Sequence, residues 1–253
     1  MYKLCFRSMD TASVKIIGCG DAFGSGGQLN TCFYLKNNSV KALIDCGASS
    51  LPALKSHKVP LPDIDAIIIT HFHGDHYGGL PFVLLYLATY GQKKKLNIIS
   101  PPGCLEKLKS LLALLYPGSQ VLEKLEIEFW SFNNSKIFHL GDLTVESFPV
   151  FHTKEALPHG VRLGLGGKVV SYSGDTGWTD TLISLADRAD LFICECCFYT
   201  MEVKGHMNYL QLREHLSRLN CKRILLTHFD KEMLINIKNI ELEYAEEGMR
   251  YEV

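Results

Sequence analysis

The sequence lacks any apolar run long enough to cross a membrane. Its longest such run, Leu80 to Leu87, is far shorter than the roughly 20 residues that a spanning helix needs. The N-terminus also lacks the apolar stretch and the cleavage site that mark a secretory signal peptide. We therefore expect a cytoplasmic protein that has no membrane partner.

The sequence also has no large excess of positive or of negative charge. The 253 residues include 26 Lys and Arg and 27 Asp and Glu, which gives a formal net charge of −1. This balance argues against a broad basic surface, so we expect no stable nucleic-acid partner. It does not exclude a small substrate that carries phosphate, because bound metal ions could supply the positive charge.

The nine cysteines do not follow the spacing of a zinc finger. Several, such as Cys32 and Cys46, lie in apolar segments and are interpreted as reduced core residues, as is typical of cytoplasmic proteins. Cys194, Cys196 and Cys197 stand close together. A structural zinc at these three residues is the less favoured alternative, because no second Cys or His pair lies nearby at zinc-binding spacing.

No repeat, low-complexity segment or linker divides the chain, so we predict a single domain over residues 1–253. Apolar segments of strand length alternate with helical patterns, which are clearest at residues 80–90 and 103–115. This mixture predicts an α/β protein with mixed sheets. A glycine-rich loop ends near Gly27, and no Gly-Lys-Ser/Thr follows it, so it is either a phosphate cradle or a wide turn.

Potential metal ligands crowd into one short segment that follows a predicted buried strand. The strand covers residues 64–69, and the next ten residues include His71, His73, Asp75 and His76. Such side chains are costly to crowd together without a cation, although a polar turn of hydrogen-bonded histidines is the alternative. The spacing indicates two metals, with His71 and His73 facing one ion while Asp75 and His76 face the other.

Three single residues are further candidate ligands. His152, Asp175 and His228 each come just after an apolar segment that is predicted to be a strand. Strand ends that present ligands on one side of a sheet would form one composite pocket with the His71 segment. Their shared placement therefore favours a metal site over unrelated surface positions.

The segment from His71 to His76 resembles the signature of the metallo-β-lactamase superfamily, and the three single residues stand where that family has its other ligands. The resemblance implies a four-layer αββα sandwich of the α/β (α+β) class, and a homodimer is common among such proteins. It also implies two divalent metal ions, with Zn²⁺ favoured and Mn²⁺ or iron left open. In this family pattern the first ion is bound by His71, His73 and His152, the second by Asp75, His76 and His228, and Asp175 bridges both. Asp45 would orient the ligand loop without binding metal.

Segments later in the chain resemble ribonuclease Z and related phosphodiesterases, namely residues 171–176, 194–198, 205–206 and 226–229. In that branch a late histidine faces the scissile phosphate and is held by a glutamate on the preceding strand. Here these residues would be His206 and Glu195, and together with Asp75 they are the candidate catalytic residues. The alternatives are a surface histidine near the start of a helix and a buried glutamate with another partner.

The predicted function is that of a dinuclear metal-dependent hydrolase, most simply a phosphodiesterase that acts on a small or cyclic phosphodiester through a metal-bridging hydroxide. A ribonuclease Z-type tRNA 3′ endonuclease is disfavoured. Only residues 153–174 separate two of the ligands, which leaves no room for the arm that grips tRNA. A carbon-ester hydrolase acting on a thioester, lactone or β-lactam remains an alternative, as does a binding protein with a vestigial site.

Overall fold

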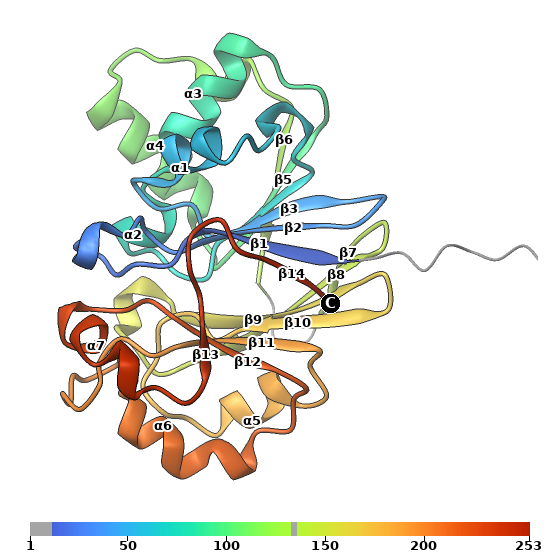
Figure 1. Cartoon of the computed structure of the whole chain (residues 1–253). Coiled ribbons are helices and arrows are strands. Elements are labelled where there is room, and N and C mark those ends of the chain that lie inside the picture. The colour runs from blue at the N-terminus through green and yellow to red at the C-terminus, as the bar shows by residue number, and fades with distance from the viewer. Residues whose placement is uncertain (1–11, 133–135) are drawn as a thin grey trace, which may run out of the picture.

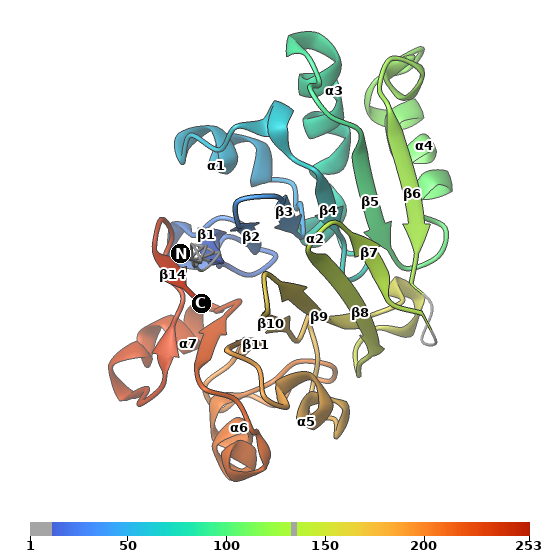
Figure 2. The same ribbon diagram turned by 90° about the vertical axis from the view of Figure 1, so that its right-hand side faces the viewer.

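Two seven-stranded β-sheets lie face to face at the centre of the molecule, with helices on their outer faces (Figures 1 and 2). The computed structural model describes residues 12–132 and 136–253. The four-layer αββα sandwich of mixed sheets predicted from the sequence is therefore confirmed. The single domain over residues 1–253 stays a prediction.

The first sheet is built mainly from the N-terminal half of the chain. Its strands, in the order β14-β1-β2-β3-β4-β5-β6, are antiparallel from β14 to β3 and parallel from β3 to β6. Their bounds are β1 (Ser13–Gly18), β2 (Cys32–Lys36), β3 (Lys41–Ile44), β4 (Ala66–Ile68), β5 (Leu96–Ser100), β6 (Ile127–Ser131) and β14 (Arg250–Glu252).

The second sheet contains only strands from the C-terminal half. Its order is β13-β12-β11-β10-β9-β8-β7, antiparallel from β7 to β10 and parallel from β10 to β13. The bounds are β7 (Phe138–Leu140), β8 (Leu143–Pro149), β9 (His159–Leu165), β10 (Lys168–Tyr172), β11 (Leu191–Glu195), β12 (Ile224–Thr227) and β13 (Glu243–Tyr244).

Each sheet has its own layer of helices, as Figure 1 shows. The first sheet is covered by α1 (Ser50–Ser56), α3 (Leu80–Tyr90) and α4 (Cys104–Leu115), and the second by α5 (Thr181–Ala186), α6 (Tyr209–His215) and α7 (Lys231–Ile235). The one-turn helix α2 (Gly74–Tyr77) lies at the same edge of the sandwich as α7. Across residues 12–132 and 136–253, none of these helices has the length and apolar character that a membrane span requires.

Apolar side chains fill the space between the two sheets. Phe33 on β2 meets Tyr172 on β10 edge to face, with ring centroids 5.1 Å apart, and both belong to one buried cluster. Separate apolar clusters fill the space between each sheet and its helices. Because each fully buried large apolar side chain contributes about 1.5–3 kcal/mol, these layers hold the strand ends in a fixed arrangement.

The segment that carries the first candidate ligands differs from the prediction in two ways. The strand expected over residues 64–69 is limited to Ala66–Ile68, and the expected loop contains α2. Helices α1 and α5 were not predicted either. Helices α1, α2 and α5 are all short, so their stability depends on packing against the sheets rather than on the helix propensity of their residues.

Glycines allow the turn that contains α2 to pack against the loop after β3. The Cys46 amide donates to the His76 carbonyl at 2.7 Å, and the Gly79 amide donates to the Cys46 carbonyl at 2.8 Å. A Cβ atom at Gly47 would lie 1.9 Å from the carbonyl oxygen of Asp75. The backbone that carries two candidate ligands therefore depends on the absence of a side chain at Gly47.

We expect Gly47→Ala to lower the free energy of unfolding by about 3 kcal/mol, because the added methyl group forces two backbone segments apart. Urea denaturation measures this loss. Gly74→Ala is the matched control, since a Cβ atom there meets nothing within 4 Å and alanine favours the helix. Equal stabilities of the two variants would show that the close approach does not constrain the turn.

Candidate metal centre

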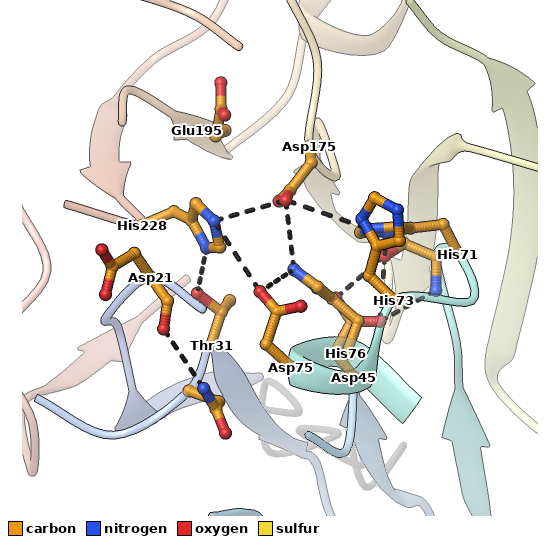
Figure 3. Close-up of polar contacts among 12 residues, drawn as sticks. Asp21, Thr31, Asp45, His71, His73, Asp75, His76, Asp175, Glu195 and His228 are labelled. Atoms are coloured by element: carbon orange, nitrogen blue, oxygen red, sulfur yellow. Dashed lines mark hydrogen bonds and ion pairs between the residues drawn. The ribbon is translucent and has the colours of Figure 1, made fainter. Parts of the chain in front are cut away.

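The candidate ligands converge at one edge of the sandwich from segments that lie far apart in the sequence (Figure 3). His228 follows β12 directly, while His71, His152 and Asp175 come three residues after the ends of β4, β8 and β10. Each lies beyond the C-terminal end of its strand, in agreement with the pattern read from the sequence. The structure therefore brings all seven predicted ligands into one region.

Two of the turns at this edge have unusual backbone conformations. His228 has a φ of 67° and Asp45 has a φ of 60°, which place both residues in the left-handed region. Residues other than glycine rarely adopt this conformation, and it persists only where the surroundings impose it. Both residues point polar groups into the cluster, so the strain lies where the ligand arrangement is set (Figure 3).

The ligands fall into two groups. The nitrogens of His71, His73 and His152 lie within 4.8 Å of one another, and His152 Nε2 is 3.1 Å from His73 Nδ1. The second group consists of Asp75, His76, Asp175 and His228.

Asp175 lies between the two groups. Its Oδ2 is 3.2 Å from His76 Nε2, 3.3 Å from His228 Nε2 and 3.8 Å from His71 Nε2. This position suits a carboxylate that bridges two ions. The grouping matches the division that the family resemblance implied, and the ligand roles themselves stay a prediction.

Hydrogen bonds outside the cluster orient the histidines toward its centre. In four of them Nδ1 donates to a protein oxygen and Nε2 remains directed inward. The pairs are His71 with Thr70 Oγ1 at 3.1 Å, His76 with Asp45 Oδ2 at 2.7 Å, His152 with the Gly205 carbonyl at 2.7 Å and His228 with Thr31 Oγ1 at 3.1 Å. In a neutral imidazole this arrangement leaves the lone pair on Nε2, the atom that would then bind a metal ion.

Two inward atoms have no hydrogen-bond partner that would account for their burial. His71 Nε2 and Asp175 Oδ1 are buried and take part in no hydrogen bond among the described residues. Unsatisfied buried polar atoms are costly, and two in one cluster indicate that a ligand completes the site. Nitrogen and carboxylate donors at these positions fit a pair of divalent cations, including Zn²⁺.

The protonation states suit cation binding at most of these positions. Burial lowers the pKa of His71 well below its usual range and that of His152 to about 4, so both are neutral at pH 7. Burial alone would raise the pKa of Asp175, but His228 and His76 hold it well below its ordinary value. Burial opposes protonation of His76, yet the facing carboxylates raise its pKa, so metal binding there would release a proton.

Asp45 supports the cluster from behind. Besides its contact with His76, this fully buried carboxylate accepts the Thr70 amide at 2.8 Å and the Thr70 hydroxyl at 2.9–3.0 Å. Its oxygens are thus committed to the turn that carries the ligands. This is the orienting arrangement that the resemblance implied.

We expect Asp45→Asn to weaken metal binding by about 10- to 100-fold, because the amide holds the His76 imidazole less firmly in its metal-binding tautomer. Competition with a chelating dye measures the change. Asp190→Asn is the control, since Asp190 also accepts a backbone amide, from Val169 at 2.8 Å, but lies outside the cluster. If both variants bind metal as the wild type does, Asp45 has only a structural role.

Glu195 and His206 form a pair beside both ligand groups. His206 Nδ1 donates to Glu195 Oε1 at 2.5 Å, and Glu195 Oε2 accepts the Met207 amide at 2.8 Å. The His206 ring packs against His152 at 4.7 Å and is parallel to that of His228 at 6.1 Å. His206 and Glu195 are therefore hydrogen-bonded to each other, as the resemblance implied.

The His206 side chain is suited to carry a proton at neutral pH. Burial by itself would lower its pKa, but the hydrogen bond and charge of Glu195 raise it to about 9. The side chain remains 21% exposed, so its free Nε2 edge can be reached from the cavity, whereas Glu195 is fully buried. The start of the adjacent helix is capped by Asn208, whose side chain accepts the Gln211 amide at 2.8 Å, so His206 is not needed as a cap.

The glycine-rich loop after β1 is held by an aspartate. Asp21 accepts the Phe23 amide at 3.1 Å, the Ser25 amide at 2.9 Å and the Ser25 hydroxyl at 2.8 Å. These amides are therefore not free to bind a phosphate. The structure favours the wide turn over the phosphate cradle.

The three clustered cysteines do not form a ligand group of their own. Cys194 and Cys196 belong to the apolar cluster under the helices of the second sheet. Among the described residues, the one candidate ligand group that contains a cysteine combines Cys197 with His206 and His228. The arrangement gives no support to a structural zinc bound by all three thiols.

A cavity of about 440 Å³ opens onto the cluster. It is lined by polar residues of the centre and by further residues, namely Ala22, Phe23, Phe198, Val203, Asp230 and Lys231. The glycine-rich composition predicted a loop before Gly27 but gave no role to its aromatic residue, and Phe198 lies in the segment 194–198 that resembles ribonuclease Z. No signal in the sequence identifies Val203, Asp230 or Lys231, which come after β11 and β12.

The layered fold and the His/Asp cluster define a hydrolase of the metallo-β-lactamase fold. The crystal structure of the metallo-β-lactamase fold protein YhfI from Bacillus subtilis superposes with a TM-score of 0.79. The match covers 96% of this chain and 100% of YhfI at 22% sequence identity. The family model described as Anti-Pycsar protein Apyc1 matches residues 12–251, and the chain belongs to this family.

Two relatives match over most of their lengths. Anti-Pycsar protein Apyc1 of Bacillus phage BSP38 is 28% identical over 96% of this chain and 99% of the phage protein. Ribonuclease Z of Clostridium acetobutylicum is 27% identical over 85% of this chain and 87% of the ribonuclease. The predicted superfamily and the assignment as a hydrolase are thereby confirmed.

Proposed function

We propose that this protein hydrolyses a small or cyclic phosphodiester, such as a cyclic nucleotide or a 2′,3′-cyclic phosphate. Two divalent metal ions would be held by His71, His73, His152, Asp75, His76, His228 and the bridging Asp175. The observation that carries the proposal is the Glu195–His206 pair, which lies next to both ligand groups. Opening a cyclic phosphodiester releases an alkoxide, which needs a proton donor at this kind of position.

Divalent ions bound in the cluster would supply an activated water and positive charge for the phosphate oxygens. The protein residues then have distinct tasks. His206 donates the proton on Nε2 to the departing oxygen, while Glu195 fixes the ring through Nδ1 and stabilises its charged form. Asp75 lines the same cavity and would orient the attacking water by accepting a hydrogen bond from it.

The structure supports a small substrate rather than tRNA. Residues 153–174 contain a 3₁₀ turn (Lys154–Ala156), β9 and β10, so this interval is used by the sheet and contains no extended arm. The cavity of about 440 Å³ lies within the range typical of small-molecule sites. The ribonuclease Z relative supports the diester chemistry in general.

A substrate panel tests the proposal directly. Protein loaded with Zn²⁺ or Mn²⁺ and shown by elemental analysis to hold two ions per chain is assayed with cyclic nucleotides, bis(p-nitrophenyl) phosphate, a thioester and a lactone. We expect turnover of the diesters and little turnover of the carbon esters. Hydrolysis of the thioester or lactone alone would instead support a carbon-ester hydrolase.

A further inference from the structure

His206 stands at the end of a loop that links β11 to α6. This segment, residues 199–206, is named the His206 loop. Its returning end is fixed beside the metal centre, where the Gly205 carbonyl accepts a hydrogen bond from His152 Nδ1 at 2.7 Å. Its outgoing end is fixed by a residue of another element, Glu232 of α7, which is not among the predicted site residues.

The Glu232 carboxylate accepts hydrogen bonds from three consecutive residues of the loop. Its Oε2 accepts the Tyr199 amide at 3.0 Å and the Met201 amide at 3.3 Å. Its Oε1 accepts the Thr200 amide at 3.2 Å and the Thr200 hydroxyl at 2.6 Å. Burial alone would raise the pKa of Glu232, but these hydrogen bonds lower it, so the side chain is charged at neutral pH.

The capping of α7 does not account for this arrangement. The helix is already capped by Asp230, whose side chain accepts the Met233 amide at 2.8 Å. Glu232 instead directs both of its oxygens to the neighbouring loop. Because α7 follows the ligand candidate His228, this contact ties the loop that carries His206 to the segment after β12.

We propose that Glu232 is a positioning residue that keeps the His206 loop closed and thereby fixes the imidazole of His206 beside the metal centre. The inference rests on the proposed function and adds to it a residue that acts through His206. The connection along the chain is short, since the His206 amide donates to the Val203 carbonyl at 3.0 Å, two residues beyond Met201. Hydrogen bonds to a charged acceptor are about twice as strong as neutral ones, so a neutral side chain at this position would hold the loop less firmly.

A comparison of two substrates separates this role from general destabilisation. We expect Glu232→Gln to lower kcat for a cyclic nucleotide by about 10- to 100-fold with little change in KM, because a displaced general acid transfers its proton poorly. The loss for bis(p-nitrophenyl) phosphate should be small, since p-nitrophenolate departs without being protonated. Glu243→Gln is the matched control, because that carboxylate is 51% exposed and pairs with Arg223 outside the loop.

A double-mutant cycle identifies the residue through which Glu232 acts. If Glu232 acts through His206, adding Glu232→Gln to His206→Ala should lower kcat for the cyclic nucleotide no further. A loss in the double variant equal to the product of the two single losses would overturn the inference, because Glu232 would then act independently of His206.

A third test does not depend on turnover. Lys204 is exposed within the His206 loop, and trypsin cleaves a folded protein where the chain opens locally. We expect cleavage after Lys204 to be about 10-fold faster in Glu232→Gln than in the wild type. Thr200→Val, which lacks only the hydroxyl donor, should show a smaller increase.

The outcomes of these tests distinguish the inference from the proposed function. Faster cleavage after Lys204 in a protein that hydrolyses no diester would support the hold of Glu232 on the loop, and the proposed function alone would fail. An unchanged cleavage rate in both Glu232→Gln and Thr200→Val would overturn the inference. Equal losses of activity toward both substrates in Glu232→Gln would do the same, since they would assign the carboxylate a merely structural role.

Discussion

Asp175→Asn should reduce turnover of a cyclic phosphodiester by roughly 10³-fold, equivalent to about 4 kcal/mol of transition-state stabilisation. The Oδ2 atom of Asp175 lies within 3.8 Å of histidines from both ligand groups, and its Oδ1 is buried without a hydrogen-bond partner among the described residues. An amide has the same shape but lacks the negative charge that holds two cations close together. Steady-state kinetics and elemental analysis of the purified variant measure the two losses.

The effect of a chelator on the unfolding temperature is a second test of the bridging role of Asp175. A strong chelator should lower the unfolding temperature of the wild type, because a ligand that binds only the folded state stabilises it. The chelator should have a much smaller effect on Asp175→Asn. Asp180→Asn serves as the control, since that side chain is 76% exposed and pairs with Arg218 away from the cluster. Full metal content and full activity in Asp175→Asn would rule out the bridging role.

His206→Ala should lower kcat for a cyclic nucleotide by about 10²- to 10⁴-fold, the range typical of a lost general acid. The expected loss for bis(p-nitrophenyl) phosphate is small, because p-nitrophenolate departs without being protonated. Metal content should remain unchanged, since His206 belongs to neither of the two predicted ligand sets. His139→Ala, on an exposed part of β7, controls for the removal of an imidazole.

Glu195→Gln distinguishes a positioning role from a merely structural one. The carboxylate raises the pKa of His206, so the proton-bearing form is present below that pKa and is lost as pH rises through it. The glutamine variant lacks this effect, and its kcat for the cyclic nucleotide should therefore decline at a lower pH than that of the wild type. Identical pH profiles would contradict the assigned role.

Candidate ligands could be predicted from the sequence where they stand close together in the chain. His71, His73, Asp75 and His76 are near neighbours in sequence, so their ligand character is visible before any folding is considered. The later ligands could be found because apolar strands are recognisable and polar residues at strand ends are unusual. The partnership of Glu195 with His206 was accessible only through resemblance, since nothing in the spacing of the two residues indicates a hydrogen bond.

Other features depended on contacts between distant segments. The left-handed conformation of His228 accompanies a hydrogen bond to Thr31, almost 200 positions earlier in the chain. The turn at Gly47 depends on its close approach to Asp75. The exposure of Phe23 follows from how Asp21 holds its loop, which the glycine content alone left open between two interpretations.

By itself, then, the order of residues determined the chemical type of the centre and the alternation of strands that supports it, because donor identity and hydrophobic periodicity are local properties. Which donors lie within reach of one another, which imidazole nitrogen faces inward and what lines the approach to the centre were decided only when two sheets packed together. Those properties are set by distances between strand ends, and such distances exist only after the apolar layers have been buried.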